Sequence, residues 1–483
     1  MIMIKKILIA NRGEIALRII RACKELNIKT VSIFSEVDIQ GVWLKKADEC
    51  YPILGDPIRA YLDYEKIVSL AKKADCDAIH PGYGFLSESA EFAEYCEKNG
   101  ITFIGPKAEH IALFGDKIAS KQAMRRVGIP VLPGTDEPIN DVSKAIKIAD
   151  EIGFPVIIKA AFGGGGRGMR IVHESKDFKK LYEAATNEAK NFFGKGDVFI
   201  EKYLENPRHI EVQIIADRYG NVVHLGERDC SIQRRHQKVI EVAPSPRLDA
   251  NTRKEIYRAS QKAMFRLGYE NVGTLEYLVD KNDNFYFIEM NTRVQVEHPI
   301  TEAISGIDIV QRMIEIAGGD KLRFLQEEIT FRGYAIEFRI NAEDPQKGFA
   351  PSPGQITEHL SSGGPGVRLD SIAYKGYTIP PHYDSMITKL IIWSLDWQGA
   401  VNKARRALDG FIVRGVASNI PLHRQIVRDE DFINGIFDTG YLDKKLPHFS
   451  LDAIDDMEQE TLKMEGISKM IESIKKNNLT VRQ

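Results

Sequence analysis

The start of the chain restricts it to a small group of folds. Residues 6–12 (KILIANR) form an apolar run that predicts a buried strand, and Gly13 ends it. Residues 14–26 carry apolar side chains at helical spacing, and residues 29–34 (KTVSIF) predict a second strand. Two strands connected by a helix and short turns form a parallel pair, because the helix returns the chain to the same end of the sheet. The sequence therefore predicts an α/β fold that begins with a parallel sheet.

The pattern of predicted elements changes twice along the chain, which predicts three domains and a tail. Alternating strands and helices continue to about residue 115, and a small α+β unit follows at about 131–203. Later parts contain more glycine and proline, which is typical of hairpins. We predict domains at 1–115, 116–330 and 331–448, followed by a charged tail with some helical periodicity at 449–483. The tail is either a solvated helix or a docking helix for a partner subunit.

A glycine run at 163–168 (GGGGRG) marks a loop that can approach a phosphate closely. Gly163, Gly165 and Gly168 match the G-x-G-x-x-G spacing of dinucleotide sites, but such a site must open a helix. Residues 169–173 (MRIVH) alternate like a strand, so the run is predicted to be the tip of a hairpin. Its backbone N–H groups suit a lid over nucleotide phosphates. Two alternatives stay open: a surface turn, and a nicotinamide dehydrogenase if a helix follows the run.

Residues 273–291 predict a hairpin that brings two acids together. The strands GTLEYLV and FYFIEMN are rich in β-branched and aromatic residues, and the linker DKNDN has the composition of a turn. If the turn is centred between Asn282 and Asp283, Glu276 lies directly opposite Glu289. The apolar neighbours of both acids argue against their exposure.

Facing carboxylates in a buried sheet repel each other, and a divalent cation reverses that interaction. Asn291 lies two residues beyond Glu289 and shares its face of the strand. Mg²⁺ prefers such hard oxygen ligands and often bridges carboxylates to substrate phosphates. We therefore predict that Glu276, Glu289 and Asn291 hold Mg²⁺ (or Mn²⁺) together with ATP. The alternative is an edge hairpin with solvated carboxylates.

Composition excludes several classes of partner and compartment. The chain has 66 Lys+Arg and 68 Asp+Glu, a net charge of -2, which gives no electrostatic reason to expect nucleic acid or an acidic membrane. No apolar run approaches the roughly 20 residues of a membrane span, and the N-terminus lacks the organisation of a signal peptide. The five cysteines form no C-x-x-C pair. We expect a reduced, cytoplasmic protein without a disulfide framework or a zinc site.

Several motifs resemble those of one enzyme family. The segment 289–299 (EMNTRVQVEHP) resembles the biotin carboxylase family of ATP-grasp enzymes. Further motifs of that family follow the same order along the chain: IANRGEIALRIIRACKELNIKTV at 9–31, HPGYGFLSE at 80–88, FIGP at 103–106, GGGGRGM at 163–169, EKYLENPRHIEVQ at 201–213, GERDCSIQRRHQK at 226–238, RINAEDP at 339–345 and YDSMITKL at 383–390. The resemblance covers about residues 4–448. It implies an N-terminal Rossmann-like parallel sheet, a central ATP-grasp domain with a glycine-rich lid, and a C-terminal mixed, β-rich domain.

The resemblance also implies an activity. Members of the family are ligases that carboxylate biotin with ATP and bicarbonate through carboxyphosphate, as the first half-reaction of acetyl-CoA carboxylase or pyruvate carboxylase. The implied cofactors are ATP, Mg²⁺ and biotin as a carrier-bound substrate. No A-M-K-M-like biotin acceptor occurs in the sequence. The expected partner is therefore a separate biotin carboxyl carrier protein or biotinylated carboxyltransferase subunit, and we also expect a homodimer. The final acceptor stays open among acetyl-CoA, pyruvate, another acyl-CoA and 2-oxoglutarate.

Site residues follow from matching this sequence to the family motifs. The implied catalytic residues are Lys238, Arg293, Glu297 and Arg339, with Glu297 as the general base. The implied ATP site consists of Lys117, Lys159, Gly165, Gly166, Glu201, Lys202, Tyr203, Leu204, His209, Gln233, His236, Glu276 and Glu289. The bicarbonate site consists of Lys238, Arg293, Gln295 and Val296, and the biotin site of Tyr83 and Arg339, with Glu88 nearby. Because Arg293, Gln295 and Glu297 alternate, an extended backbone would point all three the same way.

Two departures from the family pattern stand out, at Phe162 and at residues 240–242, and we expect neither to touch a ligand. Two other functions remain open besides the dehydrogenase. One is an ATP-grasp ligase for a different acid and acceptor, which would not need the bicarbonate residues. The other is a nucleotide-sensing protein without turnover, which would not need a general base at Glu297.

Overall fold

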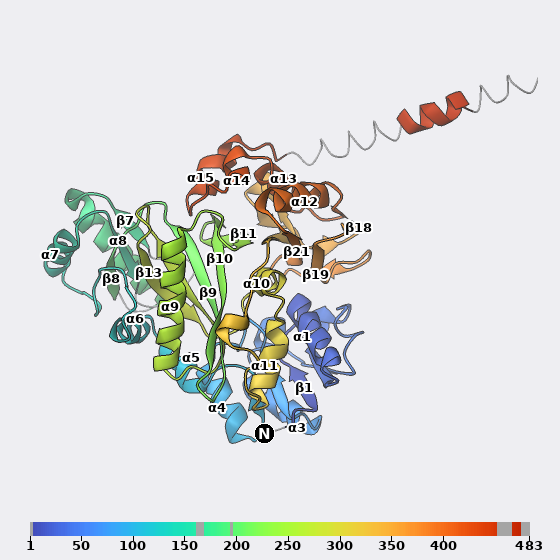
Figure 1. The fold of residues 1–483 in the computed structure, drawn as a ribbon, viewed down its shortest axis with the longest axis horizontal. Coiled ribbons are helices and arrows are strands. Elements are labelled where there is room, and N and C mark those ends of the chain that lie inside the picture. Colours follow the sequence, from blue (N-terminus) through green and yellow to red (C-terminus); the bar gives the residue numbers. More distant parts are fainter. Residues whose placement is uncertain (1–2, 161–168, 194–196, 452–465, 475–483) are drawn as a thin grey trace, which may run out of the picture.

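The computed structural model describes residues 3–160, 169–193, 197–451 and 466–474, and Figure 1 shows the arrangement of their elements. Within these ranges, three sheets have three or more strands. None of the helices in these ranges combines the length and apolar character needed to cross a lipid bilayer. The part of the predicted tail at 466–474 is helical and exposed; its remaining residues at 452–465 and 475–483 lie outside the described ranges.

The N-terminal sheet is parallel throughout, which confirms the prediction from the first residues. Its strands follow the order β3-β2-β1-β4-β5, and all four pairings are parallel. The strands are β1 (Lys6–Ile9), β2 (Lys29–Phe34), β3 (Glu49–Pro52), β4 (Ala78–His80) and β5 (Thr102–Phe103). The helices are α1 (Gly13–Glu25), α2 (Pro57–Ala60), α3 (Tyr64–Lys73), α4 (Ala90–Lys98) and α5 (Ala108–Gly115).

A small antiparallel sheet flanks the glycine run. It consists of β6 (Val156–Ala160), β7 (Arg170–Val172) and β8 (Val198–Lys202) in the order β7-β6-β8. The helices α7 (Val142–Ile152) and α8 (Ser175–Phe193) pack against it and form a separate hydrophobic cluster. The element after the run is the strand β7, so the helix required by the dehydrogenase alternative is absent at residues 169–172, and that alternative is wrong. The run itself lies outside the described residues.

The largest sheet has eight strands and joins the second and third predicted regions without a break. Its order is β13-β12-β9-β10-β11-β14-β21-β19, with every pair antiparallel. The strands are β9 (Arg208–Ala216), β10 (Val222–Arg234), β11 (Gln237–Ala243), β12 (Asn271–Val279), β13 (Phe285–Asn291), β14 (Tyr334–Asn341), β19 (Val367–Ser371) and β21 (Met386–Ser394). Short pairs complete the last region: β15 (Glu343–Asp344) with β16 (Ala350–Pro351), β17 (Gly354–Gln355) with β20 (Thr378–Ile379), and β18 (Glu358–Leu360) with β22 (Ile412–Arg414).

Helices cover both faces of this sheet. The remaining helices are α6 (Lys117–Arg126), α9 (Ala250–Arg266), α10 (His298–Ser305), α11 (Ile309–Ala317), α12 (Trp397–Asp409), α13 (Ile420–Ile426), α14 (Glu430–Ile433) and α15 (Tyr441–Lys445). The apolar residues Ile210, Val212 and Ile214 of β9 join the cluster that includes residues of α9. Because side chains alternate along a strand, the residues between them face the opposite side. That opposite face carries the candidate site.

Candidate active site

A cavity of about 1120 Å³ collects most of the predicted site residues. Its lining draws on loops and helices of the N-terminal domain, on the small sheet, and on both halves of the eight-stranded sheet. The predicted residues on its wall are Tyr83, Glu88, Lys159, Lys202, Tyr203, Leu204, His209, Gln233, His236, Lys238, Glu276, Glu289, Asn291, Arg293, Gln295, Val296, Glu297 and Arg339. Lys117 and Glu201 lie outside this lining, and Gly165 and Gly166 lie outside the described residues.

Three acids form a row across neighbouring strands, and two of them, Glu276 and Glu289, line the cavity. In β9, His209, Glu211 and Gln213 alternate with the apolar residues that face α9. Glu211 pairs directly with Glu276 of β12, and Glu276 pairs directly with Glu289 of β13. Glu211 and Glu276 are buried, whereas Glu289 is exposed. The predicted pairing of Glu276 and Glu289 is confirmed, but the expectation that both are buried is wrong for Glu289.

A β-bulge brings Glu289 to this face. From the turn, Tyr277 pairs with Phe287, yet the next pair along the strands is Glu276 with Glu289, so Ile288 is an extra residue. Phe287 joins the hydrophobic cluster next to α9. Without the bulge, Glu289 would face that cluster as well, because residues two apart in a regular strand share a face. Near the turn, the strands pair symmetrically about Asn282, so the predicted centre between Asn282 and Asp283 is wrong there. The extra residue Ile288 then shifts the register by one position, which restores the predicted pairing of the two acids.

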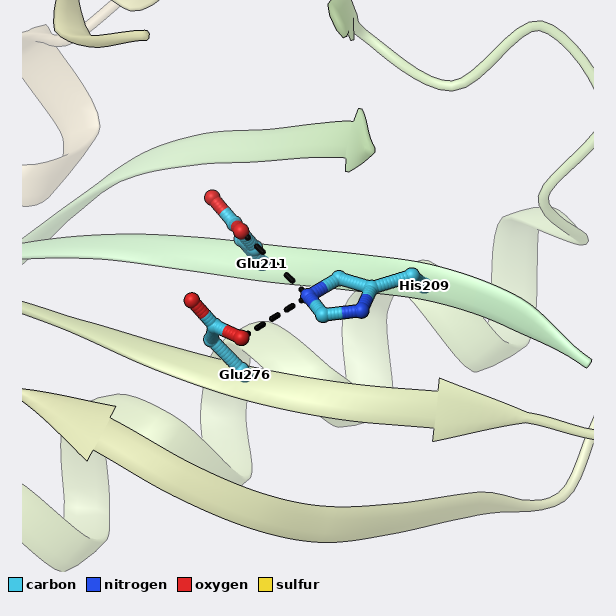
Figure 2. A group of neighbouring side chains, drawn as sticks. All are labelled: His209, Glu211 and Glu276. Carbon is cyan, nitrogen blue, oxygen red and sulfur yellow. Dashed lines mark ion pairs between the residues drawn. The ribbon is translucent and has the colours of Figure 1, made fainter. Parts of the chain in front are cut away.

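His209 compensates the two buried acids (Figure 2). Its Nε2 lies 2.9 Å from Oε2 of Glu276 and 3.3 Å from Oε1 of Glu211, and both side chains point toward the ring. Burial alone would lower the pKa of His209, but Glu276 and Glu211 raise it to about 9. The imidazole is therefore a cation at neutral pH. Nε2 of Gln233 lies 3.2 Å from its Nδ1.

Lys238 is the centre of a second charge cluster. Its Nζ donates to Glu211, to Oε1 of Glu276 at 3.0 Å and to Oε1 of Glu297 at 2.9 Å. Burial opposes its charge, but the three carboxylates hold the pKa of Lys238 well above its usual value. Burial also opposes the charge of Glu297, yet Lys238 and Arg339 lower the pKa of this carboxyl. Glu297 is therefore an anion, which a general base must be.

Arg293 lies at the entrance to this cluster. Its guanidinium donates to Oδ1 of Asn291 at 2.7 Å, to Oε1 of Gln295 at 3.0 Å and to Oε2 of Glu88 at 3.0 Å. Gln295 in turn donates to Oε1 of Glu276 at 3.0 Å. Arg293, Gln295 and Glu297 line one cavity as predicted. The predicted cause, an extended backbone through all three residues, is wrong, because the chain turns at Glu297 (φ -81°, ψ 9°) to begin α10.

Arg339 links Glu297 to an acid that sequence analysis missed. Its guanidinium lies 3.0 Å from Oε2 of Glu297 and 2.5 Å from Oε1 of Glu241. Burial raises the pKa of Glu241 to about 7, although Arg339 opposes that shift. Glu337 lies directly opposite Glu241 in the sheet and is also fully buried. Glu241 thus belongs to the segment 240–242 that departs from the family pattern, and it contacts a site residue; the expectation that this segment touches no ligand stays a prediction.

Several lysines gather between α6 and the small sheet. Nζ of Lys159 lies 2.6 Å from Oε2 of Glu201, and Lys121 contacts the other oxygen of the same carboxylate. Burial and neighbouring cations lower the pKa values of Lys121 and Lys159 from their usual range, whereas the Glu201 carboxylate that contacts both favours their charged forms. Lys117 begins α6, one turn before Lys121, and its charge acts on Glu289. Lys121 was not among the predicted site residues.

Hydrogen bonds from the backbone and from the Lys202 side chain fix the end of β8 and the segment that follows it. Lys202 N donates to Pro133 O at 2.8 Å, and Tyr203 N donates to Pro155 O at 3.0 Å. Nζ of Lys202 donates to Gly153 O at 2.9 Å and Phe154 O at 3.1 Å. His236 sits at an exposed turn between β10 and β11, where its φ is 64°. Lys202, Tyr203, Leu204 and His236 all reach the cavity.

Tyr83 connects the N-terminal domain to the rest of the site. Its hydroxyl donates to Oε1 of Glu14, and the same carboxylate lies 3.1 Å from Nζ of the buried Lys389. Lys389 also donates to the backbone oxygen of Val296 at 2.8 Å. A chain of three contacts therefore joins Tyr83 to Val296.

A divalent cation fits the row of acids. The pKa of Glu289 is raised chiefly by the charge of the facing Glu276, which Lys117 and Lys238 only partly offset. Nδ2 of Asn291 donates to Oε1 of Glu276 at 2.7 Å, which places the amide beside the same carboxylate. Glu276, Glu289 and Asn291 together offer hard oxygen atoms, and the charge at Glu289 is only partly compensated by its neighbours, which suits Mg²⁺.

Comparisons with known proteins agree over nearly the whole chain. The model "Biotin carboxylase, N-terminal domain" matches residues 3–111, "Carbamoyl-phosphate synthase L chain, ATP binding domain" matches 116–325, and "Biotin carboxylase C-terminal domain" matches 337–444. The small subunit of 2-oxoglutarate carboxylase from Hydrogenobacter thermophilus is 53% identical, over 92% of this chain and 94% of its own. One of the subunits of pyruvate carboxylase from Methanothermobacter thermautotrophicus is 53% identical over 92% and 90%.

A solved structure shows the same fold. The biotin carboxylase domain dimer of the Hydrogenobacter thermophilus 2-oxoglutarate carboxylase, in complex with MgADP, ADP and bicarbonate, superposes with a TM-score of 0.88. It is 53% identical in sequence, and the match covers 92% of this chain and 98% of that one.

Proposed function

Since this chain belongs to the biotin carboxylase family, we propose which of its residues carry the reaction of that family. The enzyme is an ATP-dependent ligase that carboxylates biotin with bicarbonate. The observation that carries the assignment of residues is the position of Arg293, Lys238 and Glu297. All three meet in one cavity beside the row of acids.

We propose that the nucleotide lies between the small sheet and the row of acids. Lys117 and Lys159 bind the phosphates, because compact ammonium groups suit their diffuse charge. The backbone of the segment Glu201, Lys202, Tyr203 and Leu204 contacts the adenine, and the lid residues Gly165 and Gly166 cover the phosphates. His209, Gln233 and His236 complete the pocket. A relative with bound MgADP supports this arrangement.

Glu276, Glu289 and Asn291 are proposed to hold Mg²⁺ (or Mn²⁺). The bound ion supplies positive charge that offsets the phosphate oxygens during phosphoryl transfer. The residues themselves need this partner, because Glu276 raises the pKa of Glu289 and only part of the charge is compensated. His209 keeps Glu276 ionised and therefore available as a ligand.

Bicarbonate is proposed to bind at Lys238, Arg293, Gln295 and the backbone of Val296. The Arg293 guanidinium is planar and presents paired donors, which match a planar oxyanion. Glu297 accepts the bicarbonate proton, and the oxygen thus freed attacks the γ-phosphorus of ATP while ADP leaves. The product, carboxyphosphate, separates into CO₂ and phosphate.

The second step occurs at Arg339 and Tyr83. Phosphate takes the proton from the ureido nitrogen of biotin, and that nitrogen then forms a bond to the carbon of CO₂. Arg339 stabilises the negative charge that develops on the ureido oxygen. Its anchoring by Glu241 and Glu297 fixes the guanidinium before biotin arrives. Tyr83 contributes to the wall of the biotin site.

We propose that biotin arrives on a separate carrier protein or biotinylated carboxyltransferase subunit. Both relatives of 53% identity are named as subunits of larger carboxylases, which supports a multi-subunit enzyme. We also propose a homodimer, since a relative of known structure is a dimer. The two relatives serve different acceptors by name, so 2-oxoglutarate and pyruvate are both candidate acceptors. The five free thiols are consistent with the proposed cytoplasmic location.

The test is ATP cleavage by the purified protein with and without bicarbonate and free biotin. We expect ADP formation to need bicarbonate and to rise when biotin is added. Cleavage that depends on another acid and ignores biotin would favour a different ATP-grasp ligase. Tight ATP binding without any cleavage would favour a nucleotide sensor.

A further inference from the structure

Lys121 is a third lysine at the nucleotide end of the cavity. It lies four residues after Lys117 on α6, so both side chains project from one side of the helix. The Asp116 side chain caps this helix and accepts hydrogen bonds from the backbone of Ile118 at 2.8 Å and Ala119 at 3.0 Å. The first turn of α6 is therefore fixed, and Lys121 points at the small sheet from a defined position.

Glu201 is the acid that Lys121 contacts, and it is shared. One oxygen of the carboxylate contacts Lys121, and the other lies 2.6 Å from Nζ of Lys159. Glu201 is only 6% exposed, so an unpaired charge there would be costly. Lys159 and Glu201 lie on the paired strands β6 and β8, two positions apart along the sheet, because Glu201 pairs with Ile157.

The proposed function requires a movement of Lys159 that its ion pair with Glu201 opposes. Lys159 must turn its ammonium group toward the phosphates of ATP, but Glu201 holds that group in the structure. If Glu201 lost Lys159 and had no other cation, a nearly buried carboxylate would be left without a partner. Lys121 is the cation that already contacts it.

We propose that Lys121 is a positioning residue for nucleotide binding, which keeps Glu201 paired when Lys159 moves to the phosphates. The proposal rests on the assignment of Lys159 to the ATP site. Lys121 acts through Glu201 and not on the nucleotide, because its ammonium group contacts the Glu201 carboxylate. Its effect is therefore confined to ligands that carry phosphates.

The test compares Lys121→Met in two backgrounds by titrating ATP and adenosine. In the wild-type background, we expect the ATP dissociation constant to rise about tenfold, the scale of one charge pair. Adenosine affinity should stay within about twofold. Combined with Glu201→Gln, which removes the charge that holds Lys159, the same lysine substitution should change ATP affinity less than about twofold.

Two further variants control the test. Lys121→Arg keeps the charge and should retain most of the ATP affinity, whereas Lys147→Met on the exposed side of α7 should leave it unchanged. An equal loss in the wild-type and Glu201→Gln backgrounds would overturn the proposal, because Lys121 would then act on the phosphates directly. An equal loss for adenosine would also overturn it by showing a general structural role. Failure of the wild-type protein to bind ATP would instead reject the proposed function.

Discussion

At the scale of single residues, the site is organised by cations that serve several acids at once. Lys238 contacts Glu211, Glu276 and Glu297, and Arg339 contacts Glu297 and Glu241. Glu297 is thus held between two cations. This arrangement keeps the proposed base ionised and fixed, and it also limits how strongly that carboxylate can attract a proton.

Removing the base without removing its volume tests the role of Glu297. Glu297→Gln cannot accept a proton, so we expect bicarbonate-dependent ATP cleavage to fall by about 100-fold to 10,000-fold. ATP affinity should stay within about twofold, since Glu297 is not proposed to contact the nucleotide. Steady-state ADP formation and ATP titration measure the two effects. Glu327→Gln, at an exposed position, is the control. Near-normal turnover of Glu297→Gln would assign the base elsewhere.

Glu241 provides a prediction about pH. Burial raises its pKa to about 7, so the side chain loses its proton as the pH rises through neutrality. Protonated Glu241 attracts Arg339 less, which leaves the guanidinium to Glu297 and weakens that base. We expect kcat to rise with pH through about 7 in the wild type. Glu241→Gln mimics the protonated form and should give a lower kcat without this step, as a series of assays from about pH 5.5 to about 8.5 would show. An unchanged pH profile would contradict the role of Glu241.

Sequence patterns predicted the local partners of the site better than the distant ones. Glu276 and Glu289 belong to one hairpin, so their pairing follows from a short stretch of chain. Glu211 was missed, although its alternation with Ile210 and Val212 marks it as a residue of the cavity face. Lys121 and Glu241 gave no such signal, because their partners Glu201 and Arg339 are far away in the sequence.

At the scale of elements, the predicted strands and helices are present with small changes at their ends. The strand at 29–34 was predicted with the observed bounds, whereas the first strand ends at Ile9 rather than at residue 12. The bulge at Ile288 was not foreseen, because nothing in the local sequence distinguishes it from a regular strand position. It decides which face Glu289 occupies, so a single extra residue determines the composition of the site.

The cap of α6 connects helix stability to nucleotide binding. Asp116→Ala removes the acceptor for Ile118 N and Ala119 N, and we expect the free energy of unfolding to fall by about 1 kcal/mol. Because α6 carries Lys117 and Lys121, ATP affinity should fall as well. Asp249→Ala removes the equivalent cap of α9 and should cost similar stability without weakening ATP binding. Chemical denaturation measures the free energy of unfolding of each variant, and ATP titration measures its ATP affinity. Equal ATP affinities in the two variants would contradict the link.

At the scale of the whole molecule, two structural units differ in how they are held together. The eight-stranded sheet runs from β9 to β21 through continuous hydrogen bonding. The small sheet β7-β6-β8 has its own hydrophobic cluster with α7 and α8. Separate clusters often open independently, because each can unfold without exposing the other.

Hydrogen exchange can test this division. Under native conditions with low denaturant, we expect amides of β6 and β8 to exchange through a local opening of lower free energy. Amides of β9, β11 and β14 should exchange together at a higher free energy, since they share one sheet. A common free energy for all these strands would show that the small sheet is not an independent unit. Loss of protection in β14 before β9 would contradict a continuous large sheet.

The unbroken large sheet has a consequence for the order of events in turnover. Arg339 and the row of acids stand on the same ladder of strands, so their separation is set by the strand spacing of about 4.8 Å and cannot shrink when substrates arrive. The positions of Arg339 and of these acids relative to each other therefore stay fixed during turnover. Because Glu297 contacts both Lys238 and Arg339, a short-lived intermediate formed at the proposed bicarbonate site has only a short path to Arg339, and the cavity walls along that path determine how much of it escapes to water.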